Sequence, residues 1–168
     1  MLKLDVKKMC VAGIMVAVTI VLSNFSIPIG ASRCYPIQHI TNVLAAVFLG
    51  PAYGCIMAFL TSLLRNLMGT GTLLAFPGSM IGALFAGVLY EKTKNYIFTY
   101  FAEVIGTGIV GGLLASPLAI LFMGKEATMF AFVIPFLLST VSGTIIAACF
   151  IGVLYKTKAL NYMKEILS

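Results

Sequence analysis

Six apolar runs, separated by short polar or Pro- and Gly-containing segments, fill nearly the whole chain. A membrane-spanning helix needs about 20 residues, so 168 residues hold six helices and leave no room for a separate aqueous domain. Charged residues make up only 10% of the chain, whereas about a quarter of a soluble domain is charged. The sequence therefore predicts an all-α integral membrane protein with six transmembrane helices in a single domain, residues 1–168. The predicted spans cover residues 9–27, 39–49, 52–68, 76–90, 96–123 and 129–155.

The basic residues indicate how these helices are oriented. Eight of the eleven Lys and Arg residues fall in three clusters, which precede the first run, follow the fourth and follow the sixth. Since cytoplasmic loops carry an excess of Lys and Arg, this distribution predicts that both termini are cytoplasmic. The net charge of +6 is then explained by topology, and we expect no nucleic-acid partner. The clustered residues are Lys3, Lys7, Lys8, Lys92, Lys94, Lys156, Lys158 and Lys164, and the others are Arg33, Arg65 and Lys125.

Polar side chains at two predicted outer helix ends point to a ligand site. His39 opens the second run beside Gln38, and Asn42 lies three residues later on the same helical face. Arg65 and Asn66 close the third run at a similar depth. An Arg at a helix end is often a snorkelling anchor, and a lone His near the interface is usually only hydrated. Here, however, two neighbouring helix ends both carry amide and cationic groups, and we interpret them as a binding site for a small polar ligand.

Glu103 lies in the fifth predicted span, roughly 10 Å deep at 1.5 Å per residue. A carboxyl group at that depth needs a partner or a proton. It could pair with Arg65, accept a hydrogen bond from a hydroxyl such as that of Thr107, or be protonated. Helix packing and ligand contact therefore both remain open as its role.

Small residues form two stripes. Gly13 and Ala17 lie one helical turn apart in the first run, in the small-xxx-small pattern that permits close helix approach. This stripe is either an internal seam or a docking surface for another protein. The fifth span carries Gly106, Gly108, Gly111 and Gly112, and we expect this thin span to pack inside the bundle.

Motifs of the common catalytic sites are missing. The chain contains no GxxxxGK[ST], HExxH or GxSxG motif, and no pair of carboxylates suited to acid–base chemistry. The four cysteines lack the CxxC spacing of zinc sites. The sequence therefore predicts binding without catalysis, and we expect no enzyme activity, no catalytic residue, no metal and no cofactor.

Three segments resemble the ThiW family: PIQHITNVLAAVFLGPAYG at 36–54, LTSLLRNLMGTGTLLAFPGSMIGALFAGVLY at 60–90 and EVIGTGIVGGLLASPLA at 103–119. That family comprises substrate-binding S components of energy-coupling factor (ECF) vitamin transporters and is assigned to hydroxyethylthiazole, a thiamine precursor. The resemblance implies a six-helix S-component bundle, multi-pass in the plasma membrane of a prokaryote. Such a subunit captures its ligand with high affinity near the outer face, under loops one, three and five. Its implied partners are a transmembrane coupling subunit and the two cytoplasmic ATPases of an ABC importer.

The resemblance also assigns roles to single residues. The family's AxxxA-type docking motif has its nearest match in Gly13 and Ala17. A neutral heteroaromatic ligand requires aromatic walls and one or two hydrogen bonds; Tyr35 and Phe76 are the expected walls, and Arg65 is interpreted as ordering the loops. The predicted ligand-binding residues are Tyr35, Gln38, His39, Asn42, Arg65, Asn66, Thr70, Thr72 and Phe76.

Two other functions remain open. The chain could be an S component for another vitamin or precursor, such as thiamine or its pyrimidine moiety. It could also be a non-transport membrane scaffold or assembly protein, whose polar helix ends only stabilise loops. Direct ligand binding by the purified protein distinguishes the scaffold from the capture subunits.

Overall fold

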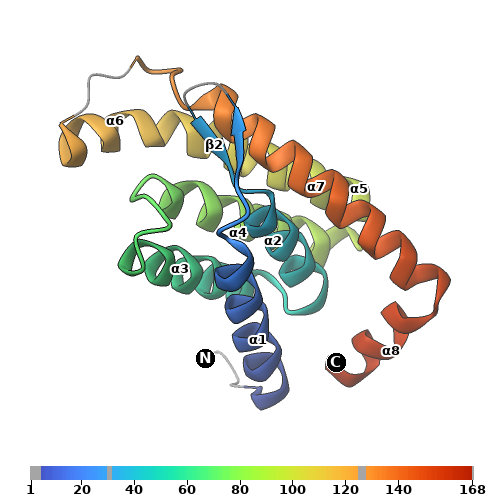
Figure 1. Cartoon of the computed structure of the whole chain (residues 1–168). Helices are drawn as coiled ribbons and strands as arrows, with labels where there is room; N and C mark the ends of the chain where they lie inside the picture. The colour runs from blue at the N-terminus through green and yellow to red at the C-terminus, as the bar shows by residue number, and fades with distance from the viewer. Residues whose placement is uncertain (1–4, 30–31, 125–127, 168) are drawn as a thin grey trace.

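The computed structural model describes residues 5–29, 32–124 and 128–167, and within them the chain is a helical bundle with one short hairpin (Figure 1). The helices are α1 (Val6–Leu22), α2 (Pro36–Phe48), α3 (Pro51–Leu67), α4 (Ala75–Thr93), α5 (Tyr96–Glu103), η1 (Val104–Gly111), α6 (Gly112–Met123), α7 (Val133–Lys156) and α8 (Ala159–Leu167). The strands β1 (Ile27–Ile29) and β2 (Ser32–Cys34) pair antiparallel.

The helical prediction is confirmed, and several predicted boundaries are corrected. The first helix ends at Leu22 rather than at residue 27, because the chain turns there into the β1–β2 hairpin. The second helix begins at Pro36, whose fixed φ suits the first helical position. Residues 36–38 were expected in a loop and instead form its first turn. The last long helix begins at Val133, four residues later than expected.

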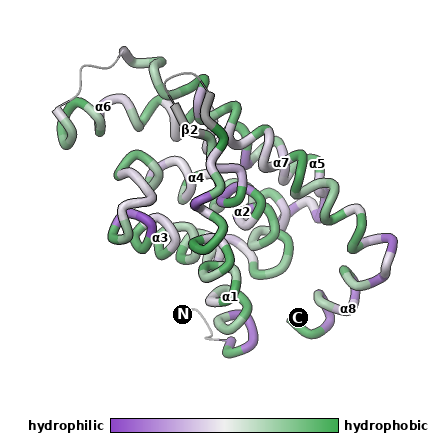
Figure 2. Tube along the Cα trace, in the orientation of Figure 1, coloured by the Kyte–Doolittle hydropathy of each residue, from purple (hydrophilic) through white to green (hydrophobic). Residues whose placement is uncertain are grey.

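The predicted fifth span, residues 96–123, is found as one continuous helix made of α5, η1 and α6. Its middle part, η1, is a π-helix, a wide form that often occurs at functional sites. This segment, Tyr96–Met123, and α7, Val133–Lys156, are the two helices of the described chain long and apolar enough to cross a membrane. Figure 2 shows how apolar the chain is as a whole. The count of six spans stays a prediction.

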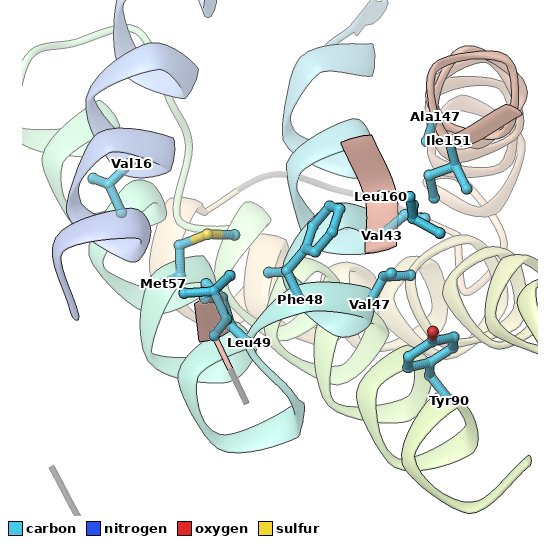
Figure 3. Close-up of a cluster of buried hydrophobic side chains, with 12 residues drawn as sticks. Val16, Val43, Val47, Phe48, Leu49, Met57, Tyr90, Ala147, Ile151 and Leu160 are labelled. Atoms are coloured by element: carbon cyan, nitrogen blue, oxygen red, sulfur yellow. The ribbon is translucent and has the colours of Figure 1, made fainter. Parts of the chain in front are cut away.

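Helix α2 lies at the centre of the bundle. Ten of its 13 residues are buried, and it contacts α1, α3, α4, α5, α7 and α8. Its second half contributes Val43, Val47 and Phe48 to the main apolar cluster (Figure 3). The helix stops at Gly50, whose φ of 86° favours glycine, and Pro51 then starts α3.

Helix α4 and η1 approach each other closely through glycines. Gly78 faces Gly111, and Gly82 faces Gly106 at 2.9 Å from the position that a Cβ of Gly106 would take. At the start of α6, which continues η1, a Cβ at Gly112 would lie 2.7 Å from Cα of Val133 in α7. The prediction that this glycine-rich span packs inside the bundle is confirmed. The α1 stripe differs, because Gly13 and Ala17 are exposed and nothing lies within 4 Å of a Cβ built on Gly13.

The C-terminal helix α8 packs against the bundle. Its apolar residues Leu160 and Leu167 are buried in the main cluster. Lys164 Nζ donates hydrogen bonds to the hydroxyls of Tyr90 and Tyr96. Lys7 Nζ donates to the carbonyl of Ile166 at 3.1 Å. The start of α1, the end of α4 and α8 therefore share one end of the molecule (Figures 1 and 2).

Two of the three predicted lysine clusters meet directly at this end. Lys8 from the first cluster and Lys94 from the second line the same cavity, beside Tyr90 of α4. Lys164 of the third cluster contacts the same tyrosine. Lys3 and Lys125 lie outside the described residues. The described lysines of the three sequence clusters are thus also gathered in space, at one end of the bundle.

Candidate ligand-binding site

A cavity of about 380 Å³ lies at the end of the bundle opposite the lysine clusters. It is bounded by the residue after the hairpin, by the first turn of α2, by the end of α3 with the following loop, and by the first half of α7. Its volume is at the lower end of the range typical of small-molecule sites. The cavity is thus framed by the segments between α1 and α2, between α3 and α4, and between α6 and α7.

One side of the cavity is polar. Gln38 and His39 from α2 and Arg65 from α3 line it, and Ser79 of α4 and Thr107 of η1 add hydroxyls. Pro36 starts α2 three residues before His39, so Gln38 and His39 lie in the first turn of that helix. All five residues are less than 9% exposed.

The other side of the cavity is aromatic and apolar. Phe132 and Phe136 line it, with ring centroids 6.4 Å apart, next to Pro135. Tyr35 closes the hairpin side, and its backbone N–H donates to Ser139 Oγ at 2.8 Å, which ties the hairpin to α7. A cavity with aromatic walls on one side and hydrogen-bonding groups on the other suits a small heteroaromatic molecule.

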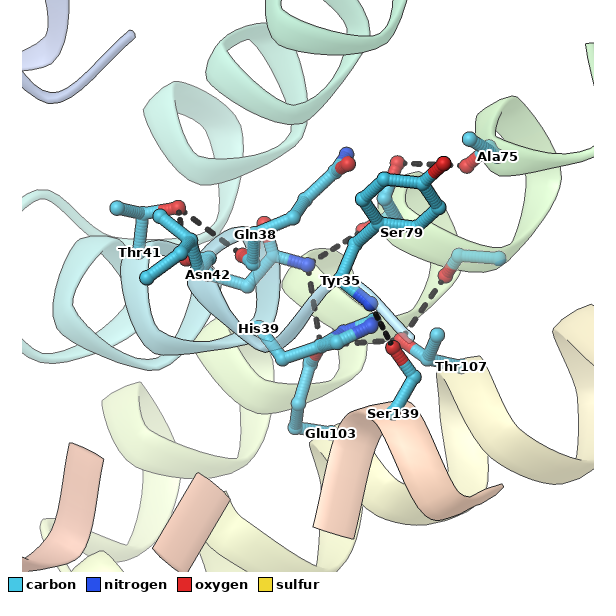
Figure 4. Close-up of polar contacts among 12 residues, drawn as sticks. Tyr35, Gln38, His39, Thr41, Asn42, Ala75, Ser79, Glu103, Thr107 and Ser139 are labelled. Atoms are coloured by element: carbon cyan, nitrogen blue, oxygen red, sulfur yellow. Dashed lines mark hydrogen bonds and ion pairs between the residues drawn. The ribbon is translucent and has the colours of Figure 1, made fainter. Parts of the chain in front are cut away.

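Glu103 holds the polar side from beneath (Figure 4). Its Oε1 lies 3.0 Å from His39 Nδ1, 3.0 Å from Asn42 Nδ2 and 3.0 Å from Thr107 Oγ1. The carboxyl group is completely buried, and its other oxygen, Oε2, has no hydrogen-bond partner among the described residues. Because Nδ1 of His39 is engaged by Glu103, Nε2 is the nitrogen of that ring left for a ligand.

A chain of hydrogen bonds links this carboxyl group to Arg65. Asn42 Nδ2 donates to the carbonyl of Ser79 at 3.2 Å, and the hydroxyls of Ser79 and Ser62 lie 3.0 Å apart. Gln38 Nε2 donates to Ser62 at 3.1 Å, and Gln38 Oε1 accepts from Arg65. The chain therefore joins residues of α2, α3, α4 and α5 in one polar layer, which fixes the rotamers that face the cavity.

Arg65 is 2% exposed and lies over the ring of Tyr35, with Cζ 4.4 Å from the ring centroid. Besides Gln38, it donates to the carbonyl of Thr70 at 3.2 Å. Its Nε has no partner among the described residues. The anchor interpretation, in which the side chain snorkels to the surface, does not describe this buried arginine.

The predicted site residues fall into two groups. Tyr35, Gln38, His39, Arg65 and Thr72 line the cavity. Asn42 lies one layer below, on Glu103, and the other three lie outside the lining. Asn66 donates to the carbonyl of Thr72 at 3.0 Å and Thr70 accepts from Arg65, so both shape the α3–α4 loop, while Phe76 pairs with Phe59 at 5.7 Å.

Sequence reasoning missed part of the site. Among the open alternatives for Glu103, the hydrogen bond to Thr107 is confirmed; Arg65 binds Gln38 and Thr70 instead of this carboxyl group. The shared face of His39 and Asn42 was a usable signal, because a buried carboxyl group needs such donors. Nothing in the apolar run of α7 distinguished Phe132 and Phe136 from residues that face lipid.

Comparison with known proteins places the chain in a family. The sequence model of the thiamine-precursor transporter protein family, ThiW, matches residues 9–157. No curated protein matched significantly. The family match covers α1 from residue 9 onward, every helix from α2 to α7 and all described residues that line the cavity. The chain therefore belongs to the ThiW family of thiamine-precursor transporter proteins.

Proposed function

We propose that this protein is the substrate-capture subunit of an ECF-type importer and that it holds hydroxyethylthiazole in the cavity. The observation that carries the proposal is the two-sided lining, with Phe132 and Phe136 opposite His39 and Gln38. The thiazole ring would lie against the aromatic side. His39, held by Glu103, would address the hydroxyl group or the ring nitrogen through Nε2. The protein binds and passes on its ligand without chemical change.

The proposed arrangement in the membrane is six spans, with both termini in the cytoplasm and the cavity facing outward. Helix α2 has 13 residues, about 20 Å at 1.5 Å per residue, which is shorter than a hydrocarbon core of about 30 Å. Because its other end reaches the lysine side, its first turn would lie below the outer surface. The short helix thus accounts for a recessed ligand site.

The proposed partners are a transmembrane coupling subunit and two cytoplasmic ATPases. The exposed Gly13 and Ala17 of α1 give a smooth surface on which a partner helix could approach closely. Since the described bundle does not fill this stripe, it is available for docking. The ligand cavity and this stripe involve different residues, so capture and docking can be tested separately.

Direct binding tests the proposal. The purified protein should bind hydroxyethylthiazole in titration calorimetry, and mass spectrometry should find a thiazole in protein isolated from cells. A ligand of about nine heavy atoms, at up to about 1.5 kcal/mol per atom, can reach nanomolar affinity in an enclosing site. If thiamine or its pyrimidine moiety bound more tightly, that molecule would replace hydroxyethylthiazole as the proposed substrate. If none of these molecules bound, the result would favour a membrane scaffold or assembly protein over a capture subunit.

Two phenylalanines provide a matched comparison. Phe136→Ala removes an aromatic wall and should weaken binding by about tenfold, the equivalent of about 1.4 kcal/mol. Phe76→Ala makes the same chemical change at a ring that pairs with Phe59 outside the cavity lining, so its effect on affinity should be smaller. The reverse order of effects would place the ligand against α4 and overturn the proposed pose.

A further inference from the structure

Arg65 is a buried cation surrounded by neutral groups. Its contacts within the described residues are the side chain of Gln38, the carbonyl of Thr70 and the ring of Tyr35. The ion pair found within this part of the chain joins His39 and Glu103 and leaves Arg65 out. Burying a guanidinium group without a carboxylate is costly, so the position needs a reason beyond loop order.

Glu103 does not supply the missing anion by direct contact. Its Oε1 is engaged by His39, Asn42 and Thr107. Its Oε2 lies against α4, since a Cβ on Gly82 would be 2.7 Å from it. The carboxyl group is therefore engaged by its own neighbours and does not contact Arg65. The neutral side chains of Gln38 and Ser62 link the two groups through hydrogen bonds.

Arg65 also has N–H donors that make no hydrogen bond within the described residues. A guanidinium group has five N–H donors, and the hydrogen bonds to Gln38 and Thr70 use two of them. Nε, which is buried, is without a partner in the described structure, and the side chain lines the cavity. A planar donor set with free capacity at a cavity wall is suited to carboxylate and phosphate oxygens.

We infer that the physiological ligand carries a terminal oxyanion, a phosphate monoester or a carboxylate on the heteroaromatic molecule, and that Arg65 receives it. The inference rests on the proposed function, because it takes the same cavity and the same class of ring. It changes the expected substrate from a neutral alcohol to an acidic derivative of it. Arg65 is then a specificity-determining residue.

The test is a calorimetric comparison of three ligands that share the ring: hydroxyethylthiazole, its phosphate ester and 4-methylthiazole-5-acetate. At least one anionic ligand should bind ten or more times more tightly than the alcohol. Arg65→Gln should abolish that preference, so that neither anionic ligand binds more tightly than the alcohol. Lys92→Gln removes an equal charge at the opposite end of the bundle, where the side chain is exposed, and should preserve the preference.

A second measurement uses the unaltered protein, so that the test survives if Arg65→Gln does not fold. The second ionisation of a phosphate monoester has a pKa of about 6. If the phosphate is the favoured oxyanion, its affinity should rise between pH 5 and pH 7.5 relative to that of the alcohol measured alongside. If the acetate is favoured, its advantage over the alcohol should persist across that range.

The outcomes separate the two proposals. Tightest binding of the neutral alcohol, with equal ligand ranking in the protein and in Arg65→Gln, would overturn the inference and leave the proposed function intact. A failure of all three thiazoles to bind, with binding of a different vitamin, would overturn both. A preference for an anionic thiazole that Lys92→Gln removes and Arg65→Gln does not would also overturn the role of Arg65.

Discussion

His39 and Glu103 are two buried ionisable residues, and their contact with each other offsets part of the free-energy cost of burying them. A carboxyl group and an imidazole are each expensive within an apolar bundle, and here one oxygen of Glu103 meets Nδ1 of His39 at 3.0 Å. The contact fixes the plane of the ring, so that Nε2 has a defined direction. We therefore regard Glu103 as a positioning residue, which acts on the ligand through His39.

Glu103→Ala and Glu103→Gln separate positioning from packing. Alanine leaves buried donors of His39 and Asn42 unpaired, at about 1–3 kcal/mol each, and should lower both thermal stability and ligand affinity. Glutamine keeps an acceptor oxygen and should recover most of both quantities. Ligand titrations and thermal melts of the two variants provide the measurement; equal affinity in the wild type and Glu103→Ala would remove Glu103 from the site.

Gly82 makes room for the same carboxyl group. A Cβ there would collide with Thr107 Oγ1 and lie 2.7 Å from Glu103 Oε2. Gly82→Ala should therefore destabilise the protein by about 1–3 kcal/mol through overpacking. The control is Gly152→Ala in α7, where nothing lies within 4 Å of the new Cβ; alanine is the better helix former, so its melting temperature should stay equal or rise. Equal melting temperatures for the two variants would contradict the close approach.

At the scale of elements, the long helix from Tyr96 to Met123 consists of two α-helical parts joined by a π-helical part. Its first part, α5, ends in Glu103, and η1 follows with the glycines that meet α4. The last part, α6, extends past the cavity to Met123, which lines it. The π-helical turns shift the register between α5 and α6, and Glu103 beneath the cavity and Met123 in its lining belong to the same continuous helix.

The α1 stripe yields a prediction about docking. Gly13→Leu combined with Ala17→Leu adds bulk to an exposed surface, so ligand binding and stability of the isolated protein should be unchanged. Co-purification with the coupling subunit and ATPases, and uptake by cells, should fall together. The matched control adds similar bulk to the exposed face of α7, through Cys149→Leu with Gly152→Leu. If that control reduces co-purification as much as the α1 variant, the stripe has no special role.

Helix α8 is fastened by Lys164. Burial lowers the pKa of Lys164, but the hydrogen bonds that its ammonium group donates to the Tyr90 and Tyr96 hydroxyls raise it, and the net direction is upward from 10.5. A raised lysine pKa contributes stability that is complete below the unfolded pKa and is lost only as pH rises through the folded value. Lys164→Ala should thus lower the melting temperature by a few degrees, about 1 kcal/mol, by the same amount at pH 6 and pH 8.5.

Lys156→Ala is the control for this prediction, because that side chain is exposed at the end of α7. Its melting temperature should match that of the wild type. A Lys164→Ala effect that disappears between pH 6 and pH 8.5 would mean that a different group, titrating near neutrality, holds α8 in place.

At the scale of the whole molecule, the apolar runs were enough to predict a helical bundle but not its centre. The bounds of the predicted fifth span, residues 96–123, are those of the long helix. The hairpin was missed because two three-residue strands leave no period to detect. The site was half predicted, since His39 and Arg65 are conspicuous in an apolar sequence. Which side of α7 faces the cavity depends on tertiary packing, and Phe136 carries no sign of it.

Cysteine labelling measures the orientation of the bundle in the membrane. Cys34 is only 1% exposed, so an introduced cysteine is the better reporter. In a background with Cys10, Cys55 and Cys149 replaced by Ala, Leu73→Cys lies at the cavity end and Thr93→Cys at the lysine end, both at exposed positions. An impermeant maleimide added to intact cells should label the first and reach the second only after permeabilisation. Labelling in the reverse order would invert the proposed topology.

The position of the polar layer on α2 has a consequence for the electrical tightness of the membrane. Polar side chains occupy the first half of that helix, and the stretch from Val43 to Val47, whose last two residues line the cavity at the lysine end, is entirely apolar. Water and ions that enter the ligand cavity meet this apolar stretch, together with Phe48 and Met57. A cell that produces the subunit without its partners should therefore keep its membrane potential, since the protein conducts no ions whether its cavity is filled or empty.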